Sequence, residues 1–221
     1  MKYKMCASIA QKTPRTINST LQKALTVCDY AELRLDFLKP NDVPIALELC
    51  KSKISKTICT LRPKSQGGVF TGTERERISI MKLIAEYNPY LLDVEYTVIK
   101  KNPNLYRYIS DTKTNVLCSW HDFKRTPSIK ELHSKMALME KYSKYVKIVT
   151  MAVKPSDAAT ILALYSKRSK TNLVAFAMGD LGKISRLLCL YLGSPFTFVS
   201  LGRAIAPGQL SARQMLDTLI V

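Results

Sequence analysis

Hydrophobic positions follow two alternating patterns along the chain. Short apolar runs, typical of buried strands, occur eight times, over residues Tyr3–Ile9, Tyr30–Leu35, Lys56–Leu61, Tyr90–Glu95, Asn115–Trp120, Tyr145–Val149, Leu173–Met178 and Phe196–Leu201. Longer segments with one apolar face, typical of helices, lie at Thr16–Cys28, Asn41–Ser52, Glu74–Tyr87, Asn102–Asp111, Ser128–Tyr142, Ser156–Ser166, Gly182–Leu192 and Ser211–Leu219. The pattern therefore predicts eight strands alternating with eight helices.

Local capping signals support the helical segments. Ser128 is followed three residues later by Glu131, which is the spacing of a capping box. The sequence Pro155-Ser156-Asp157 is typical of another helix start.

Strands separated by helices are predicted to run parallel, because each return must cross the sheet through a helix. An open doubly wound sheet is the alternative, but no G-x-G-x-x-G follows the first strand, and eight repeats favour closure. We therefore expect an α/β fold, a (β/α)₈ TIM barrel, as a single domain over residues 1–221.

Polar side chains gather near the ends of the predicted strands, where a (β/α)₈ barrel carries its chemistry. In the second strand, alternation sends Glu32, Arg34 and Asp36 to one face. The other strand ends carry Arg62, Asp93, Glu95, Ser119, His121, Lys147, Arg186 and Gln209. An ion-paired barrel core is the structural alternative for any one charge, but the whole set indicates an active site.

Lys147 is the sharpest single signal. It lies within Tyr145-Val146-Lys147-Ile148-Val149, an apolar strand in which a solvated lysine would be out of place. Burial disfavours the ammonium form, and a neutral amine can attack a ketone. A lysine at an exposed strand edge is the alternative interpretation.

His121 lies at the end of the strand before Lys147, where an imidazole can both accept and return a proton. The other histidine, His133, falls within a predicted helix. Two histidines without ligand spacing give no case for a metal, and no cofactor is expected.

Three arginines from different strand ends, Arg34, Arg62 and Arg186, could converge. The planar guanidinium suits bidentate binding of a carboxylate. Together with a lysine that attacks ketones, they indicate an anionic substrate that bears a ketone.

Net charge and cysteine content bear on the partners and the cellular compartment of the chain. The net charge of +17 allows nucleic-acid binding as an alternative function, but the lysines are spread along the chain without an aromatic-rich basic cluster. No apolar run approaches the length needed to cross a membrane. The six cysteines lie far apart, as expected of buried thiols in a reducing, cytoplasmic setting.

Taken in order, these residues resemble the type I 3-dehydroquinate dehydratase family over nearly the whole chain. The matching segments are Glu32-Leu33-Arg34-Leu35-Asp36, Arg62 before Gly67-Gly68, Asp93-Val94-Glu95, Ser119-Trp120-His121-Asp122-Phe123, Lys147, Met178-Gly179 with Ser185-Arg186, and Pro207-Gly208-Gln209. The resemblance implies a lyase that forms 3-dehydroshikimate from 3-dehydroquinate in the shikimate pathway. A homodimer is a candidate assembly.

The resemblance also implies a role for each matching residue. Lys147 would form an imine with the substrate ketone, and His121 would serve as general base and general acid. Arg186 would hold the substrate carboxylate. Further substrate contacts would come from Glu32, Arg34, Arg62 and, on a mobile eighth loop, Gln209. Asp93 and Glu95 would stand behind the lysine and histidine.

Three positions depart from the family pattern. Gln66 stands where many relatives carry Glu, so its amide oxygen can accept a hydrogen bond but supplies no charge. Trp120 replaces a smaller or polar residue before His-Asp, and Ile205 replaces a Ser before Ala-Pro-Gly-Gln. These changes predict an altered pocket wall and one lost hydrogen bond to substrate.

A class I aldolase of the same barrel type is the remaining enzymatic alternative, since it also uses a strand lysine on a ketone. Sugar-phosphate aldolases need a glycine-rich phosphate site after the seventh and eighth strands. The chain has Gly179, Gly182 and Gly202 there, beside Arg186, so the sequence alone leaves this alternative open.

Overall fold

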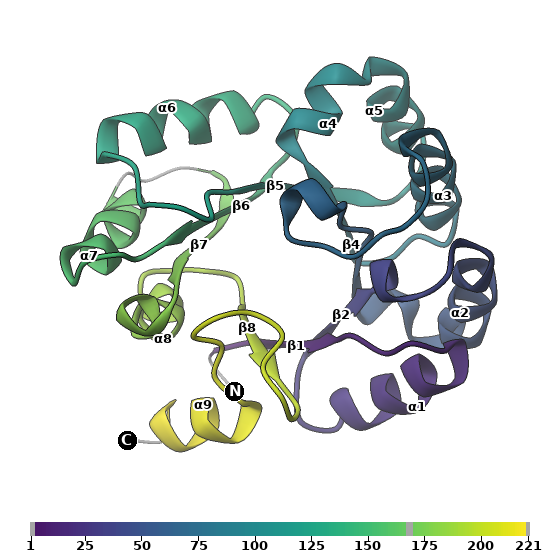
Figure 1. Cartoon of the computed structure of the whole chain (residues 1–221), viewed down its shortest axis with the longest axis horizontal. Helices are drawn as coiled ribbons and strands as arrows, with labels where there is room; N and C mark the ends of the chain where they lie inside the picture. Colours follow the sequence, from purple (N-terminus) through teal and green to yellow (C-terminus); the bar gives the residue numbers. More distant parts are fainter. Residues whose placement is uncertain (1–2, 167–169, 220–221) are drawn as a thin grey trace. The chain divides into compact units, whose positions relative to one another are not determined.

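The computed structural model describes residues 3–166 and 170–219 and contains all eight predicted strands (Figure 1). The strands are β1 (Met5–Ile9), β2 (Tyr30–Arg34), β3 (Thr57–Thr60), β4 (Leu91–Glu95), β5 (Asn115–His121), β6 (Tyr145–Met151), β7 (Asn172–Met178) and β8 (Thr197–Ser200). They form one sheet in the order β7-β6-β5-β4-β3-β2-β1-β8, and the registered pairs β2–β3, β3–β4, β5–β6 and β6–β7 are parallel. Chain order is kept throughout, as a (β/α)₈ barrel requires.

All eight predicted helices are present with different ends, and the described residues form one further helix, α4. The helices are α1 (Pro14–Ala24), α2 (Val43–Cys50), α3 (Glu74–Glu86), α4 (Tyr96–Lys101), α5 (Pro103–Ser110), α6 (Ile129–Met139), α7 (Ser156–Leu162), α8 (Ser185–Tyr191) and α9 (Ala212–Leu219). The sequence pattern missed α4, because it follows β4 directly and Asn102-Pro103 separates it from α5.

Backbone contacts divide the chain into two compact units. Ser8–Val116 form one, here called the N-terminal unit, and Met1–Ala7 with Leu117–Val221 form the other, the C-terminal unit. The single domain expected over residues 1–221 stays a prediction, and residues 1–2, 167–169 and 220–221 lie outside the described part of the chain.

Capping explains several helix starts. The predicted box at Ser128 is confirmed, since the Ser128 hydroxyl accepts the N–H of Glu131 and the Glu131 carboxylate accepts the N–H of Ser128. A second box, between Thr73 and Glu76, opens α3. At Pro155-Ser156-Asp157 the helix does begin, but Asp157 acts by accepting the backbone N–H groups of Val153 and Lys154.

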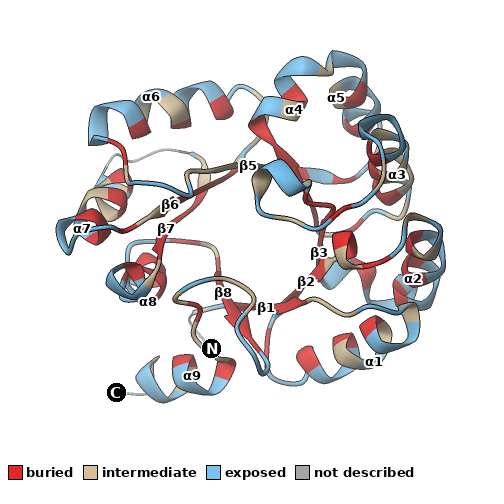
Figure 2. Cartoon of the chain, viewed as in Figure 1, coloured by how far each residue is buried: buried red, intermediate tan, exposed pale blue. Residues whose placement is uncertain are grey.

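The core lies along the strands and the strand-facing stripes of the helices (Figure 2). In the C-terminal unit, α6 packs on β6, and α7 and α8 pack on β7. All six cysteines are buried thiols, which confirms their prediction as core residues. No helix within the described residues is long and apolar enough to cross a membrane.

Candidate active site

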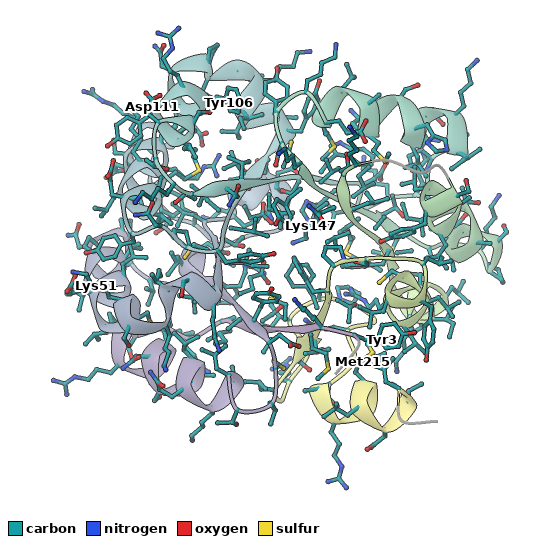
Figure 3. The ribbon with its side chains drawn as sticks, turned by 180° about the vertical axis from the view of Figure 1, so that it is seen from behind. Tyr3, Lys51, Tyr106, Asp111, Lys147 and Met215 are labelled. Carbon is teal, nitrogen blue, oxygen red and sulfur yellow. The ribbon has the colours of Figure 1, made fainter. Side chains whose placement is uncertain are left out.

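Lys147 lies in the middle of β6 and is buried, with 6% of its surface exposed. Figure 3 shows its side chain leaving β6 on the side away from α6 and α7. Its side-chain nitrogen, Nζ, lies 4.1 Å from the centroid of the Phe198 ring on β8. The structure therefore confirms a buried strand lysine and rejects the alternative of an exposed edge position.

His121 comes to the same face of the sheet as Lys147. In the parallel pairing of β5 with β6, Ser119 lies opposite Lys147 and His121 lies opposite Val149. Side chains two residues apart on a strand share a face, so Ser119, Lys147 and His121 all project to one side. The His121 ring also stacks on Phe123, with ring centroids 5.6 Å apart. An amine and an imidazole on neighbouring strands can thus reach one substrate.

Arg186 is buried at the start of α8 and lies over the Phe176 ring of β7, 4.3 Å from its centroid. One guanidinium N–H, from Nη2, is donated to the carbonyl of Pro207. The Nε atom has no hydrogen-bond partner among the described residues. Burial lowers the pKa of Arg186 to about 10, because desolvation disfavours its charged form. A carboxylate is the partner that such a buried guanidinium would favour most.

Phe176 and Phe198 join the lysine and the arginine into one cluster. Their ring centroids lie 6.3 Å apart in an edge-on arrangement, and Phe196 packs against Phe198. The Lys147 nitrogen and the Arg186 guanidinium thus both lie over aromatic faces. The sequence analysis missed these phenylalanines, although both alternate along strands already predicted.

The loop that carries Gln209 is fixed to the end of β7. Gly179 donates its N–H to the Pro207 carbonyl, and the Gln209 amide oxygen accepts the N–H of Ile205. Gly208 has a φ of +70°, and a β-carbon there would lie 2.4 Å from the Gly179 oxygen. Only glycine therefore fits at position 208, and it allows the loop to rest beside Arg186.

The N-terminal unit holds its own set of buried polar groups. The carboxylate of Glu32 on β2 is buried and accepts hydrogen bonds from Ser8 and Thr60, each at 2.9 Å. Two hydroxyl donors satisfy this carboxylate inside the unit, which explains how it can be held without water.

Arg62, after β3, is buried between two carboxylates of β4. Its Nη2 lies 2.6 Å from Asp93 and its Nη1 lies 2.7 Å from Glu95. These charges raise the pKa of Arg62 above its ordinary value, outweighing the opposite effect of burial. Asp93 and Glu95 thus orient Arg62, whereas their predicted position behind Lys147 and His121 stays a prediction.

Arg77, on α3, is a buried member of this network that the sequence analysis missed. It donates to Glu95 at 3.0 Å and to the Leu61 carbonyl at 2.9 Å, and it pairs with Glu74. A signal was available, because Arg77 is spaced with Met81 and Ile84 on the apolar stripe of the helix. Its place among the charged residues at the helix start obscured that spacing.

The side chains of Arg34 and Asp36 are hydrogen-bonded to each other. Strand β2 ends at Arg34, and Asp36 belongs to a short 3₁₀ turn. The strand alternation predicted through Asp36 is therefore wrong beyond Arg34. Two hydrogen bonds of 2.9 and 2.8 Å join the guanidinium to the Asp36 carboxylate, which also accepts the Val69 N–H. Gln66 ends the 3₁₀ turn Lys64–Gln66 in the same unit and is partly exposed.

Metal ligands do not gather in the described part of the chain, where no three His, Cys, Asp or Glu side chains form a suitable group. The functional side chains present there are an amine, an imidazole, guanidinium groups and carboxylates. This set suits proton transfer, attack on a carbonyl and binding of an anion.

Strand order, parallel pairing and the polar side chains at the strand ends are those of a (β/α)₈ enzyme. Comparison with known proteins identifies its family. The sequence profile of the type I 3-dehydroquinase family matches residues 5–221, and the chain belongs to that family. Its members are hydro-lyases of the shikimate pathway, and this chain is one of them.

Individual relatives and solved structures are consistent with this family and fold. A 3-dehydroquinate dehydratase of Methanococcus maripaludis is 32% identical over 220 residues, covering 97% of this chain and 98% of that protein. The structure of the Geobacillus kaustophilus 3-dehydroquinate dehydratase has a TM-score of 0.89 at 23% identity, over 99% of this chain and 91% of that one. The Aquifex aeolicus enzyme has a TM-score of 0.80 at 27% identity, with coverages of 96% and 95%. These likenesses confirm the predicted fold class.

Proposed function

We propose that this chain dehydrates 3-dehydroquinate to 3-dehydroshikimate through a Schiff base on Lys147. One observation carries the proposal: a buried strand lysine shares a face of the sheet with His121 and stands over an aromatic ring. The buried, apolar surroundings hold the Lys147 amine where it can attack a ketone. The same surroundings limit the access of water to the imine.

The reaction divides into four steps. The Lys147 nitrogen adds to the ketone carbon, and water leaves to give a protonated imine. The His121 imidazole removes a proton from the neighbouring carbon, and the electron pair moves to the imine nitrogen as an enamine. The enamine then expels the hydroxyl group, which takes a proton from the His121 imidazolium and leaves as water. Finally, water adds to the conjugated imine, releases the enone and restores the Lys147 amine.

Arg186 binds the substrate carboxylate in this scheme. Its guanidinium is buried on Phe176, and its Nε points to no protein acceptor among the described residues. A carboxylate would neutralise that buried charge and would raise the pKa of Arg186 from about 10 toward its ordinary value. The loop of Gln209 rests on Arg186 through Pro207, so substrate binding and loop position are linked.

Glu32, Arg34 and Arg62 contact the substrate's hydroxyl and ketone groups. Each is held by short contacts to its neighbours, namely Ser8 and Thr60, Asp36, and Asp93 with Glu95. Side chains fixed in this way lose little further freedom on binding, which favours orientation of the substrate. Gln66, in the 3₁₀ turn after Arg62, is assigned a supporting role in this proposal and supplies no charge.

Formation of the conjugated enone provides the direct test. The chain is mixed with 3-dehydroquinate, and the ultraviolet absorbance of the product is followed. We expect turnover by the native chain, loss of at least about 10³-fold in Lys147→Met, and native activity in the control Lys154→Met, an exposed lysine beyond β6. Native turnover by Lys147→Met would contradict the assignment.

We further propose that the chain forms a homodimer through α8. Ile184, Leu188 and Tyr191 recur at helical spacing, are 38–51% exposed, and are extended by Leu181 and Leu192. Among the exposed residues of this face, Lys183 is the charged one. Copies that each carry a charge of +17 repel one another, so an apolar face with a single exposed charge is where two copies can meet.

The mass of the chain in solution distinguishes a dimer from a monomer. We expect a dimer by sedimentation at micromolar concentration, a monomer for Leu188→Glu, and a dimer for the control Val27→Glu, an exposed valine of the N-terminal unit. A native monomer, or a dimeric Leu188→Glu, would contradict it. We also assign the chain to the cytoplasm, because six buried cysteines without disulfides suit a reducing compartment. We propose no nucleic-acid partner, because the lysines are spread along the chain without an aromatic-rich basic cluster.

A further inference from the structure

Arg77 is a buried arginine of α3 to which the proposed reaction gives no role. Only 1% of its surface is exposed, and α3 lies beside β4 (Figure 1). A guanidinium has five N–H donors and keeps its charge at any ordinary pH, so its burial requires several fixed acceptors. The acceptors that Arg77 uses connect the surface of α3 to Arg62.

The first acceptor lies on the same helix. Nε and Nη2 of Arg77 donate to the two oxygens of Glu74, at 2.8 and 2.9 Å. About half of the Glu74 side chain is exposed, so this pair lies toward the surface. A two-point contact of this kind fixes the plane of the guanidinium as well as its position.

The other two acceptors lie beside Arg62, and both accept from Nη1 of Arg77. Glu95 divides its carboxylate between two arginines, since Oε1 accepts from Arg62 at 2.7 Å and Oε2 accepts from Arg77 at 3.0 Å. The Leu61 carbonyl accepts at 2.9 Å, and Leu61 directly precedes Arg62 in the chain. Arg77 therefore holds the backbone from which the Arg62 side chain leaves, and also a carboxylate at its far end.

Loss of Arg77 would release both of these constraints. Glu95 would keep only Arg62 as a donor among the described residues, so its carboxylate could turn about its side-chain torsions. The Arg62 guanidinium would turn with it. A displacement of about 1 Å in a group that orients substrate is enough to weaken binding and turnover.

We propose that Arg77 is a positioning residue for substrate binding, which sets the orientation of Arg62 through Glu95 and the Leu61 carbonyl. The inference rests on the proposed function, in which Arg62 contacts the substrate. It adds to that function a residue that comes from a helix and makes no substrate contact of its own. A role in stability alone would also require a buried Arg77, so the experiment has to separate orientation from stability.

A double-mutant cycle makes this separation, because residues that act through one another are not additive. KM and kcat for 3-dehydroquinate are measured in the native chain, Arg77→Met, Arg62→Lys and the double variant, at a temperature where circular dichroism shows each to be folded. We expect Arg77→Met to raise KM at least about tenfold, with a smaller change in kcat. In the Arg62→Lys background the same substitution should change KM less than about twofold.

Two further variants complete the experiment. Arg75→Met, on the exposed side of the same helix, should keep the native KM. Arg77→Lys serves if Arg77→Met does not fold, because lysine keeps the charge but lacks the planar fork that reaches Glu74, Glu95 and Leu61 together. Its KM should rise at least about threefold in the native background and should stay level in the Arg62→Lys background.

The possible failures can be told apart. A native KM in folded Arg77→Met, or a rise by the same factor with and without Arg62, would overturn the proposal and leave Arg77 a role in stability alone. Neither result would affect the proposed function. An unchanged KM in Arg62→Lys would instead remove Arg62 from the substrate contacts of the proposed function, and would overturn the role of Arg77 with it.

Discussion

At the scale of single residues, the candidate site consists of ionisable side chains that the fold removes from water. Lys147 and Arg186 solve this problem through aromatic rings, while Arg62 and Arg77 solve it through carboxylates. The difference has a chemical consequence. A side chain that lies over a ring remains available to a substrate group, and a guanidinium held by two carboxylates is fixed in the orientation in which it can meet one.

Replacing Arg186 by lysine tests its assigned role in carboxylate binding. Arg186→Lys keeps a positive charge but removes the planar pair of donors. We expect KM for 3-dehydroquinate to rise roughly 10- to 100-fold, the equivalent of one hydrogen bond to a charged group, with a smaller change in kcat. Steady-state kinetics measure this, with Arg213→Lys on the exposed face of α9 as the matched control. An unchanged KM would remove Arg186 from the binding site.

Candidate site residues could be chosen from the sequence, because strand ends are marked by the change from apolar to polar positions. Lys147 stood out since its neighbours on both sides are apolar, and burial agrees with that signal. The side chains that contact these residues could not be predicted in the same way. Nothing local indicated that Arg62 would lie between Asp93 and Glu95, or that Phe198 would lie under Lys147, because these contacts join separate strands.

At the scale of elements, helix α3 is joined to β4 by a buried ion pair. Arg77→Met should destabilise the chain by about 3–5 kcal/mol, because it removes one partner and leaves the Glu95 carboxylate short of a donor. Urea unfolding measures the difference. Arg75→Met, an exposed arginine two residues earlier on the same helix, should change stability by less than about 0.5 kcal/mol. A similar loss of unfolding free energy in both variants would mean that the buried ion pair contributes no more to stability than an exposed arginine.

The loop after β8 gives a second prediction at this scale. Gly208→Ala requires a left-handed backbone at an alanine and brings its β-carbon to 2.4 Å from the Gly179 oxygen, so the loop must move. We expect kcat/KM to fall at least about tenfold, since Gln209 and the contact of Pro207 with Arg186 move with it.

Gly202→Ala is the matched control for that loop, because a β-carbon at position 202 meets nothing within 4 Å. Its kcat/KM should equal that of the native chain. Native activity in Gly208→Ala would show that the position of the loop does not matter for turnover.

Element boundaries show where sequence reasoning stops. The strands were predicted to within about two residues at most ends, because the apolar runs stop sharply. The region after β4 was not, since the pattern left residues 96–101 without an element and predicted one helix over Asn102–Asp111, whereas the structure has α4 and then α5. At Asp36 the backbone forms a 3₁₀ turn in which the carboxylate pairs with Arg34, and strand alternation does not anticipate this turn.

At the scale of the whole molecule, buried thiols make stability depend on alkaline pH. Burial raises the pKa of Cys59 to about 12 and that of Cys189 to about 11, against an ordinary value of 9.0. These thiols therefore ionise at a lower pH in the unfolded chain than in the folded chain. Their stabilising contribution is therefore complete below pH 9 and is lost as the pH rises toward 11–12.

The two thiols should lower the free energy of unfolding by roughly 2–3 kcal/mol between pH 8 and pH 10. Urea unfolding at the two pH values measures the change, and the Cys59→Ala, Cys189→Ala double variant should show a smaller pH dependence. The same slope in both proteins would assign the alkaline loss to other groups.

The central claim is that Lys147 forms a covalent imine with the substrate, and borohydride reduction tests it most directly. The native chain is treated with sodium borohydride in the presence of 3-dehydroquinate, digested, and mapped by peptide mass. The account predicts one ligand adduct, on the peptide that contains Lys147, with activity lost in proportion. An adduct on another lysine, or reduction without any adduct while turnover continues, would contradict it.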